Sequence, residues 1–308
     1  YQDKYYSVPT SYEALVFWYN KDFFKDNNLE YPADYAGLEK VCTLAAQKGI
    51  TPISYGVASY RAQNEWLICA VLNNYAGRDV VKQALEGKVK WTDPKIKDAI
   101  TLLDKMWKAG WVNDKKSHTI TDNDSRALFY SGKAAIRFEG SWMYDMVKSS
   151  EADIKIGVDV DKFPSLQQGV PQTLPLGIGA TWGVNGNGKK ADAVAEFINF
   201  LYTNPKLNAK AVEEAGMSMM PIVMPEDAFS SNADPLLVKL NKIVSDGQKN
   251  IETSGYVTWT FWPPQTREYM YDNIERVYLG DLTVDKYLEE TQKIFEKELA
   301  EGKVPSLP

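Results

Sequence analysis

Near the start of the chain, an extended segment marked by Pro9 leads into an unbroken apolar run at residues 15–19. Aromatic and β-branched residues dominate this run, which favours a strand. Because its apolar positions are consecutive, we expect both faces of the strand to be covered, as inside the sheet of an α/β protein. Residues 20–22 then end the strand and begin a short helix. Tyr12 and Glu13 precede the covered run, and we expect them where the strand emerges at a sheet edge or cleft.

Apolar residues at helical or alternating spacing predict the other elements. Helices are predicted over about 35–48, 62–75, 94–108, 126–130, 190–202, 205–215, 234–247, 265–279 and 283–300. Strands are predicted over about 51–56, 134–138, 154–160, 177–185 and 217–223. Residues 122–125, Asp-Asn-Asp-Ser, are interpreted as the N-cap of the helix at 126–130. Strands and helices alternate along much of the chain, which is the pattern of an α/β fold.

Length and composition narrow the class of protein. The 308 residues are enough for two domains that each bury a core. The chain is 44% hydrophobic and 25% charged, which is typical of a soluble globular protein, and no apolar run is long enough to span a bilayer. A net charge of −6 without a clustered basic face argues against a nucleic-acid partner. The 9 Trp and 18 Tyr exceed what the core requires, so we expect several of them on a surface that binds something with an apolar face.

The residue types that usually carry catalysis or hold metals are scarce. His118 is the single histidine, which removes Ser-His-Asp and Cys-His catalysis and leaves no metal cluster. Cys42 and Cys69 are interpreted as small buried hydrophobes, and a disulfide between them stays open at this point. The glycines at 177–183 fall within a predicted strand, with no following Lys-Ser/Thr, so they do not form a nucleotide loop. We expect no cofactor.

Two stretches carry a resemblance to a known family. Residues 8–15, Val-Pro-Thr-Ser-Tyr-Glu-Ala-Leu, followed by Tyr-Asn-Lys-Asp at 19–22, resemble the first crossing segment of the sugar-binding proteins of ABC importers, the maltose-binding-protein-like family. The order of the remaining elements is similar throughout. The resemblance implies an α/β, two-lobed periplasmic-binding-protein-like fold of type II, whose lobes are connected by hinges. It also implies that the first lobe is incomplete in this chain, because its N-terminal stretch is lacking.

The resemblance divides the chain into six parts. In chain order these are the first hinge crossing (1–10), the main part of the C-terminal lobe (11–176), the second hinge (177–182), a fragment of the N-terminal lobe (183–218), the third hinge (219–224) and the remainder of the C-terminal lobe (225–308). The fragment at 183–218 would hold a strand and two helices without the sheet that normally covers them.

Sugar sites combine aromatic platforms with hydrogen-bonding side chains. Trp142 follows Gly140 and Ser141 in a turn that matches the family position of a sugar-stacking aromatic residue; the alternative is a core Trp that packs the following helix. The loop at 256–264 holds four rings in seven residues before a helix. In the family an aromatic residue at the corresponding helix entry stacks on the sugar. Trp262 is the first candidate and Trp259 the second, and the alternative is a hydrophobic staple that closes the helix.

Further candidates are implied by the same resemblance. Relatives place polar and aromatic ligand contacts in the loop that holds Tyr60, Arg61 and Trp66, although Trp66 could instead belong to the core. Glu13 matches a family carboxylate in the cleft beside the hinge, with Tyr12 next to it; the alternative is an exposed charge at a strand edge. Trp182 lies at the second hinge, one residue out of register with the usual family pattern.

The sequence therefore predicts a solute-binding protein that captures a mono- or oligosaccharide between two lobes and delivers it to the membrane permease of an ABC importer. It would act at the extracellular face of the membrane, lipid-anchored or periplasmic, and it would catalyse nothing. One alternative is a glycan hydrolase that pairs Glu13 with a second acid such as Glu65, Glu139 or Asp145. Another is an engineered or split binding fragment, whose missing N-terminal part is supplied in trans.

Overall fold

The structure is a computed structural model that describes residues 6–222, 224–225 and 227–307. Residues 1–5 of the first predicted hinge, Val223 of the third, and Glu226 and Pro308 of the last part lie outside the described residues. The strands are β1 Val8–Pro9, β2 Tyr12–Asn20, β3 Thr51–Ser54, β4 Ala134–Gly140, β5 Val158–Lys162, β6 Leu174–Ile178, β7 Thr181–Trp182 and β8 Ser254–Tyr256. The helices of the first half are α1 Lys21–Asp26, α2 Tyr35–Gln47, α3 Asn64–Val71, α4 Arg78–Leu85, α5 Pro94–Lys108, α6 Asp122–Tyr130 and α7 Met143–Ser149. Those of the second half are α8 Ala191–Tyr202, α9 Pro205–Ala215, α10 Pro235–Lys249, α11 Thr258–Phe261, α12 Pro264–Tyr278 and α13 Val284–Ala300.

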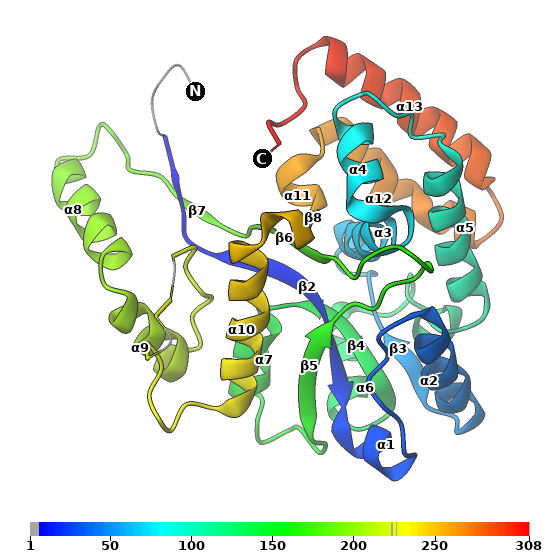
Figure 1. Ribbon diagram of the computed structural model, residues 1–308, viewed down its shortest axis with the longest axis horizontal. Coiled ribbons are helices and arrows are strands. Elements are labelled where there is room, and N and C mark those ends of the chain that lie inside the picture. The colour runs from blue at the N-terminus through cyan, green and yellow to red at the C-terminus, as the bar shows by residue number, and fades with distance from the viewer. Residues whose placement is uncertain (1–5, 223, 226, 308) are drawn as a thin grey trace.

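A six-stranded mixed sheet runs through the larger part of the molecule, with helices on both faces (Figure 1). Its strand order is β3-β4-β2-β6-β8, and β5 pairs with the far half of β2. The first residues of β2 pair antiparallel with β6, and from Leu15 onward β2 pairs with β4 and then also with β5. One long strand thus joins two halves of the sheet.

Strand β2 is covered on both faces, as the sequence predicts. Leu15 and Phe17 lie in a core that also includes residues of α2, α3, α5, α12 and α13. Val16 and Trp18 point the other way, into a second core that includes residues of α6, α7 and α10. All four side chains have an exposed fraction of 0%. Alternate side chains of one strand therefore build two cores.

Several helix ends follow from local capping. The Asn20 side chain accepts hydrogen bonds from the backbone N–H groups of Asp22 and Phe23, so the residue that ends β2 also starts α1. Asp93 caps α5, with Pro94 in its first turn. The predicted cap at residues 122–125 is wrong, because Thr121 caps α6 and the helix already begins at Asp122.

Other boundaries differ from the sequence predictions. The predicted strand at 177–185 is interrupted after Ile178, so β6 and β7 are separate strands in two different sheets. The strand predicted at 154–160 begins only at Val158. Residues 217–222 form no strand, and the helix predicted over 62–75 combines a 3₁₀ turn, α3 and a π-helical turn that ends at Gly77.

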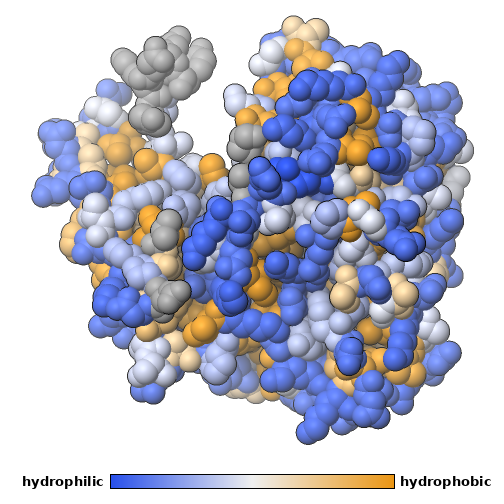
Figure 2. Space-filling view, viewed as in Figure 1, coloured by the Kyte–Doolittle hydropathy of each residue, from blue (hydrophilic) through white to orange (hydrophobic). Residues whose placement is uncertain are grey.

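Helices α8 and α9, with the two-stranded ribbon β1–β7, form a smaller unit beside the main body (Figure 1). In α8 no residue is buried. Its apolar side chains Val194, Phe197 and Phe200 are 43%, 56% and 49% exposed. Apolar side chains are also visible on this unit in Figure 2. Within the described residues this apolar stripe is left largely exposed, whereas an amphipathic helix usually packs such a stripe against a neighbour.

Candidate functional site

The turn after β4 fixes the position of Trp142. A Cβ on Gly140 would lie 2.1 Å from the Trp142 ring, so only glycine lets the indole fold back over the end of the strand. The Trp142 Nε1–H donates a hydrogen bond of 3.0 Å to Glu139 Oε1. The ring is partly buried and packs against the edge of the main core. Glu139 and Gly140 therefore fix the position of the Trp142 ring.

Three indole rings meet at this point, from segments far apart in the sequence. Trp66 in α3 packs edge-on against Trp142, with ring centroids 4.9 Å apart and planes at 64°. Trp259 in α11 also packs edge-on against Trp142, with centroids 6.1 Å apart and planes at 73°. All three rings are partly buried at the margin of the core. We call these three residues the indole cluster.

The indole cluster offers ring surface in preference to hydrogen bonds. The Trp259 Nε1–H donates to the carbonyl oxygen of Ile178 at 2.9 Å, at the end of β6. The Trp142 N–H is likewise engaged with Glu139. With these two donors satisfied inside the protein, the exposed parts of Trp142 and Trp259 are apolar C–H and π surface.

A buried ionic network lies behind Trp142. Arg137, with an exposed fraction of 0%, donates to Glu139 Oε2 from Nε at 2.8 Å and from Nη2 at 2.6 Å. Arg137 also bonds Asp122, and Arg126 lies between Asp122 and Glu139. Burial by itself would raise the pKa of Asp122, but the Arg137 charge, with Gln63 and Arg126, holds that pKa below its usual value. The network keeps Glu139 in place as the acceptor for Trp142.

A second ionic pair anchors the segment that carries Trp66. Glu65 is 3% exposed, and Arg267 of α12 donates to both of its carboxylate oxygens, with Nη2 to Oε1 at 2.8 Å. Burial raises the pKa of Glu65, and the Arg267 guanidinium limits that rise. Because Glu65 directly precedes Trp66, this bidentate pair fixes the start of α3 against α12.

Glu13 is buried beside the turn that carries Trp142, and the two side chains line the same small hollow. Glu13 is 6% exposed, and its carboxylate accepts a hydrogen bond from the Ser141 hydroxyl. Burial raises the pKa of Glu13, and hydrogen bonds from Ser141, Ser218 and Ser11 limit the rise. The hollow that it lines has a volume of about 20 Å³, which fits a water molecule but no sugar ring. Tyr12, next to it, is partly exposed.

The structure brings only some of the predicted residues together. Tyr60 is 54% exposed, and the Arg61 side chain is 59% exposed near Asp272 and Glu275 of α12. Trp182 lies in β7 opposite Val8 and borders a separate hollow of about 520 Å³ between the ribbon and α8.

The prediction of Trp262 as the first platform candidate is wrong. Its ring is 3% exposed and packs inside the core against Trp91, with centroids 5.9 Å apart. Pro263 and Pro264 start α12 directly after it, and the chain enters the helix with this ring turned inward. The second candidate of the same loop, Trp259, is the residue in the indole cluster.

Sequence reasoning missed the role of Glu139, which it considered only as an acid of a hydrolase. The sequence Glu-Gly-Ser-Trp at 139–142 could have indicated this role. In a short turn, the indole N–H of a tryptophan can donate to a carboxylate three residues earlier. The Glu65–Arg267 pair leaves no such signal, because 202 positions separate its members.

The described ranges of the chain hold no group of three or more His, Cys, Asp or Glu residues that could bind a metal ion. In the same residues no helix is both long and apolar enough to cross a membrane. Cys42 and Cys69 are buried free thiols, in agreement with their interpretation as small hydrophobes.

Comparison with known proteins shows one matching family and many similar folds. The family described as bacterial extracellular solute-binding proteins matches residues 1–234. An uncharacterised ABC transporter extracellular-binding protein of Pyrococcus horikoshii is 29% identical over 150 residues. That alignment covers 47% of this chain and 34% of the relative, so the match spans about a third of the relative's length.

Two solved structures illustrate the similarity in fold. A chitin oligosaccharide binding protein superposes with a TM-score of 0.80 at 22% identity, over 98% of this chain and 74% of its own. A protein from a study of xylan utilisation by Caldanaerobius polysaccharolyticus gives a TM-score of 0.81 at 21% identity, over 96% and 74% of the two chains. Both are longer than this chain, and at these identities the likeness concerns the fold.

Proposed function

We propose that this chain, which belongs to the family of bacterial extracellular solute-binding proteins, captures a mono- or oligosaccharide on the indole cluster and presents it to the permease of an ABC importer. The proposal is based on the packing of Trp66 and Trp259 against Trp142. The indole N–H groups of Trp142 and Trp259 are hydrogen-bonded within the protein, which leaves their ring surfaces for a ligand. A pyranose has an apolar C–H face that matches such ring surface. The structural relative that binds chitin oligosaccharide supports the choice of ligand class.

Residues around the indole cluster would supply the polar contacts. Tyr60 and Arg61 lie on the segment that leads into α3. The exposed Tyr60 hydroxyl could reach a sugar hydroxyl group, and Arg61 could do so by exchanging its ion pairs with Asp272 and Glu275. Tyr12 would contribute from β2, and Trp182 from the β1–β7 ribbon on the smaller unit. We do not assign a direct ligand contact to Glu13, because its side chain is buried and its carboxylate already accepts a hydrogen bond from the Ser141 hydroxyl.

The proposed activity is binding without turnover. A glycosidase needs two carboxyl groups set across the scissile bond, one of them free to donate a proton. Here Glu65 is held by Arg267, Glu139 by Arg137, and Glu13 by Ser141. These engagements support a binding role, and analysis of oligosaccharides after prolonged incubation tests it, since any shortened product would contradict it.

We further propose that the six-part division of the chain holds, with hinges at 1–10, 177–182 and 219–224 and a first-lobe fragment at 183–218. The unpartnered apolar stripe of α8 supports an N-terminal α/β segment as its cover, supplied in cis or in trans. The greater length of the solved relatives gives further support. The protein would work outside the cytoplasm, either in a periplasm or on a lipid anchor.

Titration with a panel of oligosaccharides, followed by tryptophan fluorescence, tests the proposal. We expect a saturable change for at least one saccharide. Trp142→Ala should weaken that binding by about 10- to 100-fold, the usual cost of losing a central aromatic contact. Tyr35→Ala, which removes a partly exposed ring outside the indole cluster, is the matched control and should leave the affinity unchanged. No response to any saccharide, or equal effects of the two variants, would count against a sugar site here.

A further inference from the structure

Three segments cross between the smaller unit and the main body. The first lies around residues 10–11, between β1 and β2, the second at residues 179–180, between β6 and β7, and the third begins at Met219. Backbone hydrogen bonds join the three segments where they pass each other. The Thr10 N–H donates to the Ala180 carbonyl at 2.7 Å, and the Gly179 N–H donates to the Ser11 carbonyl at 3.0 Å. The Tyr12 N–H donates to the Met219 carbonyl at 3.1 Å. The chain between β1 and β2 is therefore bonded to both of the other crossing segments.

The Glu13 side chain lies at this same point. The Ser141 hydroxyl donates to its carboxylate, and the hydroxyls of Ser11 and Ser218 are also within hydrogen-bonding range. Ser11 belongs to the first crossing segment, Ser218 precedes the third, and Ser141 belongs to the turn after β4. One carboxylate thus holds hydroxyls from three separate parts of the chain.

The second crossing segment is packed against the same side chain. A Cβ on Gly179 would lie 2.3 Å from Glu13 Cγ and 2.5 Å from Ser11 Oγ, so the backbone of residue 179 approaches Glu13 as closely as a glycine allows. The turn after β4 is fastened as well, since the Ala14 N–H donates to Ser141 Oγ at 3.1 Å and the Ser141 N–H donates to the Ala14 carbonyl at 2.9 Å.

We propose that Glu13 is a positioning residue that ties the three crossing segments together and sets the angle between the smaller unit and the main body. The inference rests on the proposed two-lobed, hinge-connected function, and it assigns Glu13 to the hinge instead of the ligand. A buried carboxylate that accepts several hydroxyl hydrogen bonds holds its partners with charge-assisted strength. Any rotation of one segment against the others has to break or exchange these bonds.

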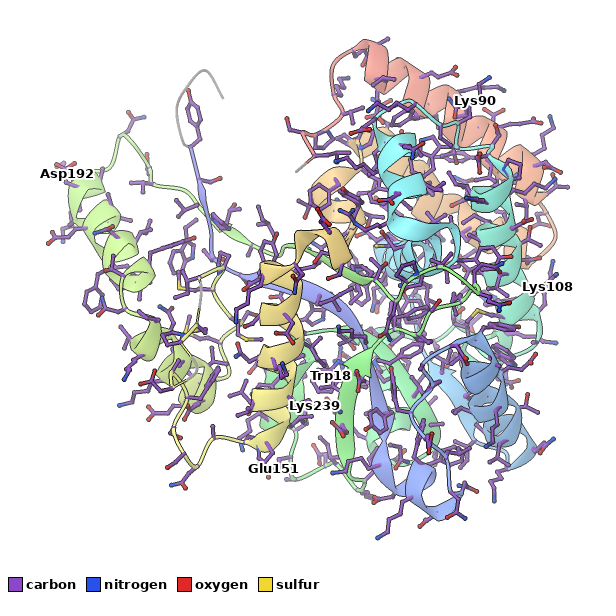
Figure 3. All side chains as sticks on the ribbon, viewed as in Figure 1. Trp18, Lys90, Lys108, Glu151, Asp192 and Lys239 are labelled. Atoms are coloured by element: carbon purple, nitrogen blue, oxygen red, sulfur yellow. The ribbon has the colours of Figure 1, made fainter. Side chains whose placement is uncertain are left out.

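Distance measurement between two spin labels tests this in the ligand-free chain of 308 residues. Asp192→Cys at the start of α8 and Lys90→Cys on the main body place labels on exposed positions at opposite sides of the molecule (Figure 3). The native thiols do not compete, because Cys42 and Cys69 are fully buried and burial raises the pKa of both.

Glu13→Gln should shift and broaden the distance distribution, because a neutral amide holds the serine hydroxyls less firmly. Ser218→Ala removes the serine hydroxyl next to the third segment, leaves the backbone bond between Tyr12 and Met219, and should shift the distribution in the same direction. Ser218 is exposed, so this variant tests the inference even if Glu13→Gln does not fold, as judged by circular dichroism. Glu151→Gln, at an exposed glutamate of the main body, is the control and should change nothing.

Unchanged distributions in both Glu13→Gln and Ser218→Ala would overturn the inference. Weaker sugar binding by Glu13→Gln with an unchanged ligand-free distribution would overturn it too, since that result identifies a direct ligand contact. The outcome is separable from the proposed function, because the distances are measured without ligand. Failure of every saccharide to bind would leave the distance result standing on its own.

Discussion

At the scale of single residues, Trp142 owes its position to the two residues at the end of β4. Glu139 accepts its indole N–H, and Gly140 leaves the space that the ring occupies. The Trp18 indole, from β2, donates to the Gly140 carbonyl at 3.1 Å and holds the strand end from the other face. A platform residue is useful for binding only when its ring is held in place beforehand, because ordering it on binding would cost affinity.

Gly140→Ala should therefore damage the platform. The added methyl group overlaps the Trp142 ring, and we expect the ring to leave its place at a cost of about 1–3 kcal/mol in the free energy of unfolding. Sugar affinity should fall together with stability. Urea unfolding and the fluorescence titration measure the two effects. Gly186→Ala is the control, because a Cβ there meets nothing within 4 Å. If Gly140→Ala binds sugar as the parent does, the ring does not need this position.

At the scale of elements, α8 differs from the other long helices in the part of the chain that the structure describes. Helix α10 buries Leu237, Leu240 and Val244, whereas α8 buries nothing. Its sequence is nevertheless amphipathic, with apolar residues at the spacing that a buried face requires. The helix is therefore suited to packing against a further segment.

Phe197→Ser tests the exposure of this face. The ring is 56% exposed, so its removal should change the free energy of unfolding by no more than about 0.5 kcal/mol. It should also lower the binding of a hydrophobic dye such as ANS. Val238→Ser, at an exposed apolar residue of α10, is the matched control and should affect dye binding much less. A loss of stability above about 2 kcal/mol would mean that Phe197 is packed in solution.

The elements were readable from the sequence where their signals are local. Asn20 and Asp93 act as caps through bonds to residues two or three positions away, so both helix starts were predicted. The meeting of Trp66, Trp142 and Trp259 depends on long-range packing, and no local pattern encodes it. The same reason explains Trp262, since the direction of a ring in a Pro-rich loop is decided by the cores it can reach. Residues 217–222 are apolar except for Ser218, but Pro221 interrupts the run, and Met219 and Met220 are buried without forming the predicted strand.

At the scale of the whole molecule, a main body holds the indole cluster, and three crossing segments join a smaller unit to it. A ligand favours closure of such a molecule only if it contacts both parts better when they are closed. The indole cluster is the proposed contact surface on one part, and Trp182 with the ribbon is the proposed surface on the other.

Saturation-transfer NMR can show directly whether a bound saccharide lies against the indole rings. Aromatic protons of the protein are saturated, and the transfer to the C–H protons of a bound saccharide is recorded. The account predicts transfer concentrated on one face of a sugar ring, strongly reduced by Trp142→Ala and retained in Tyr35→Ala. Transfer that is the same in all three proteins, or absent for every saccharide, would contradict a sugar site on the indole cluster.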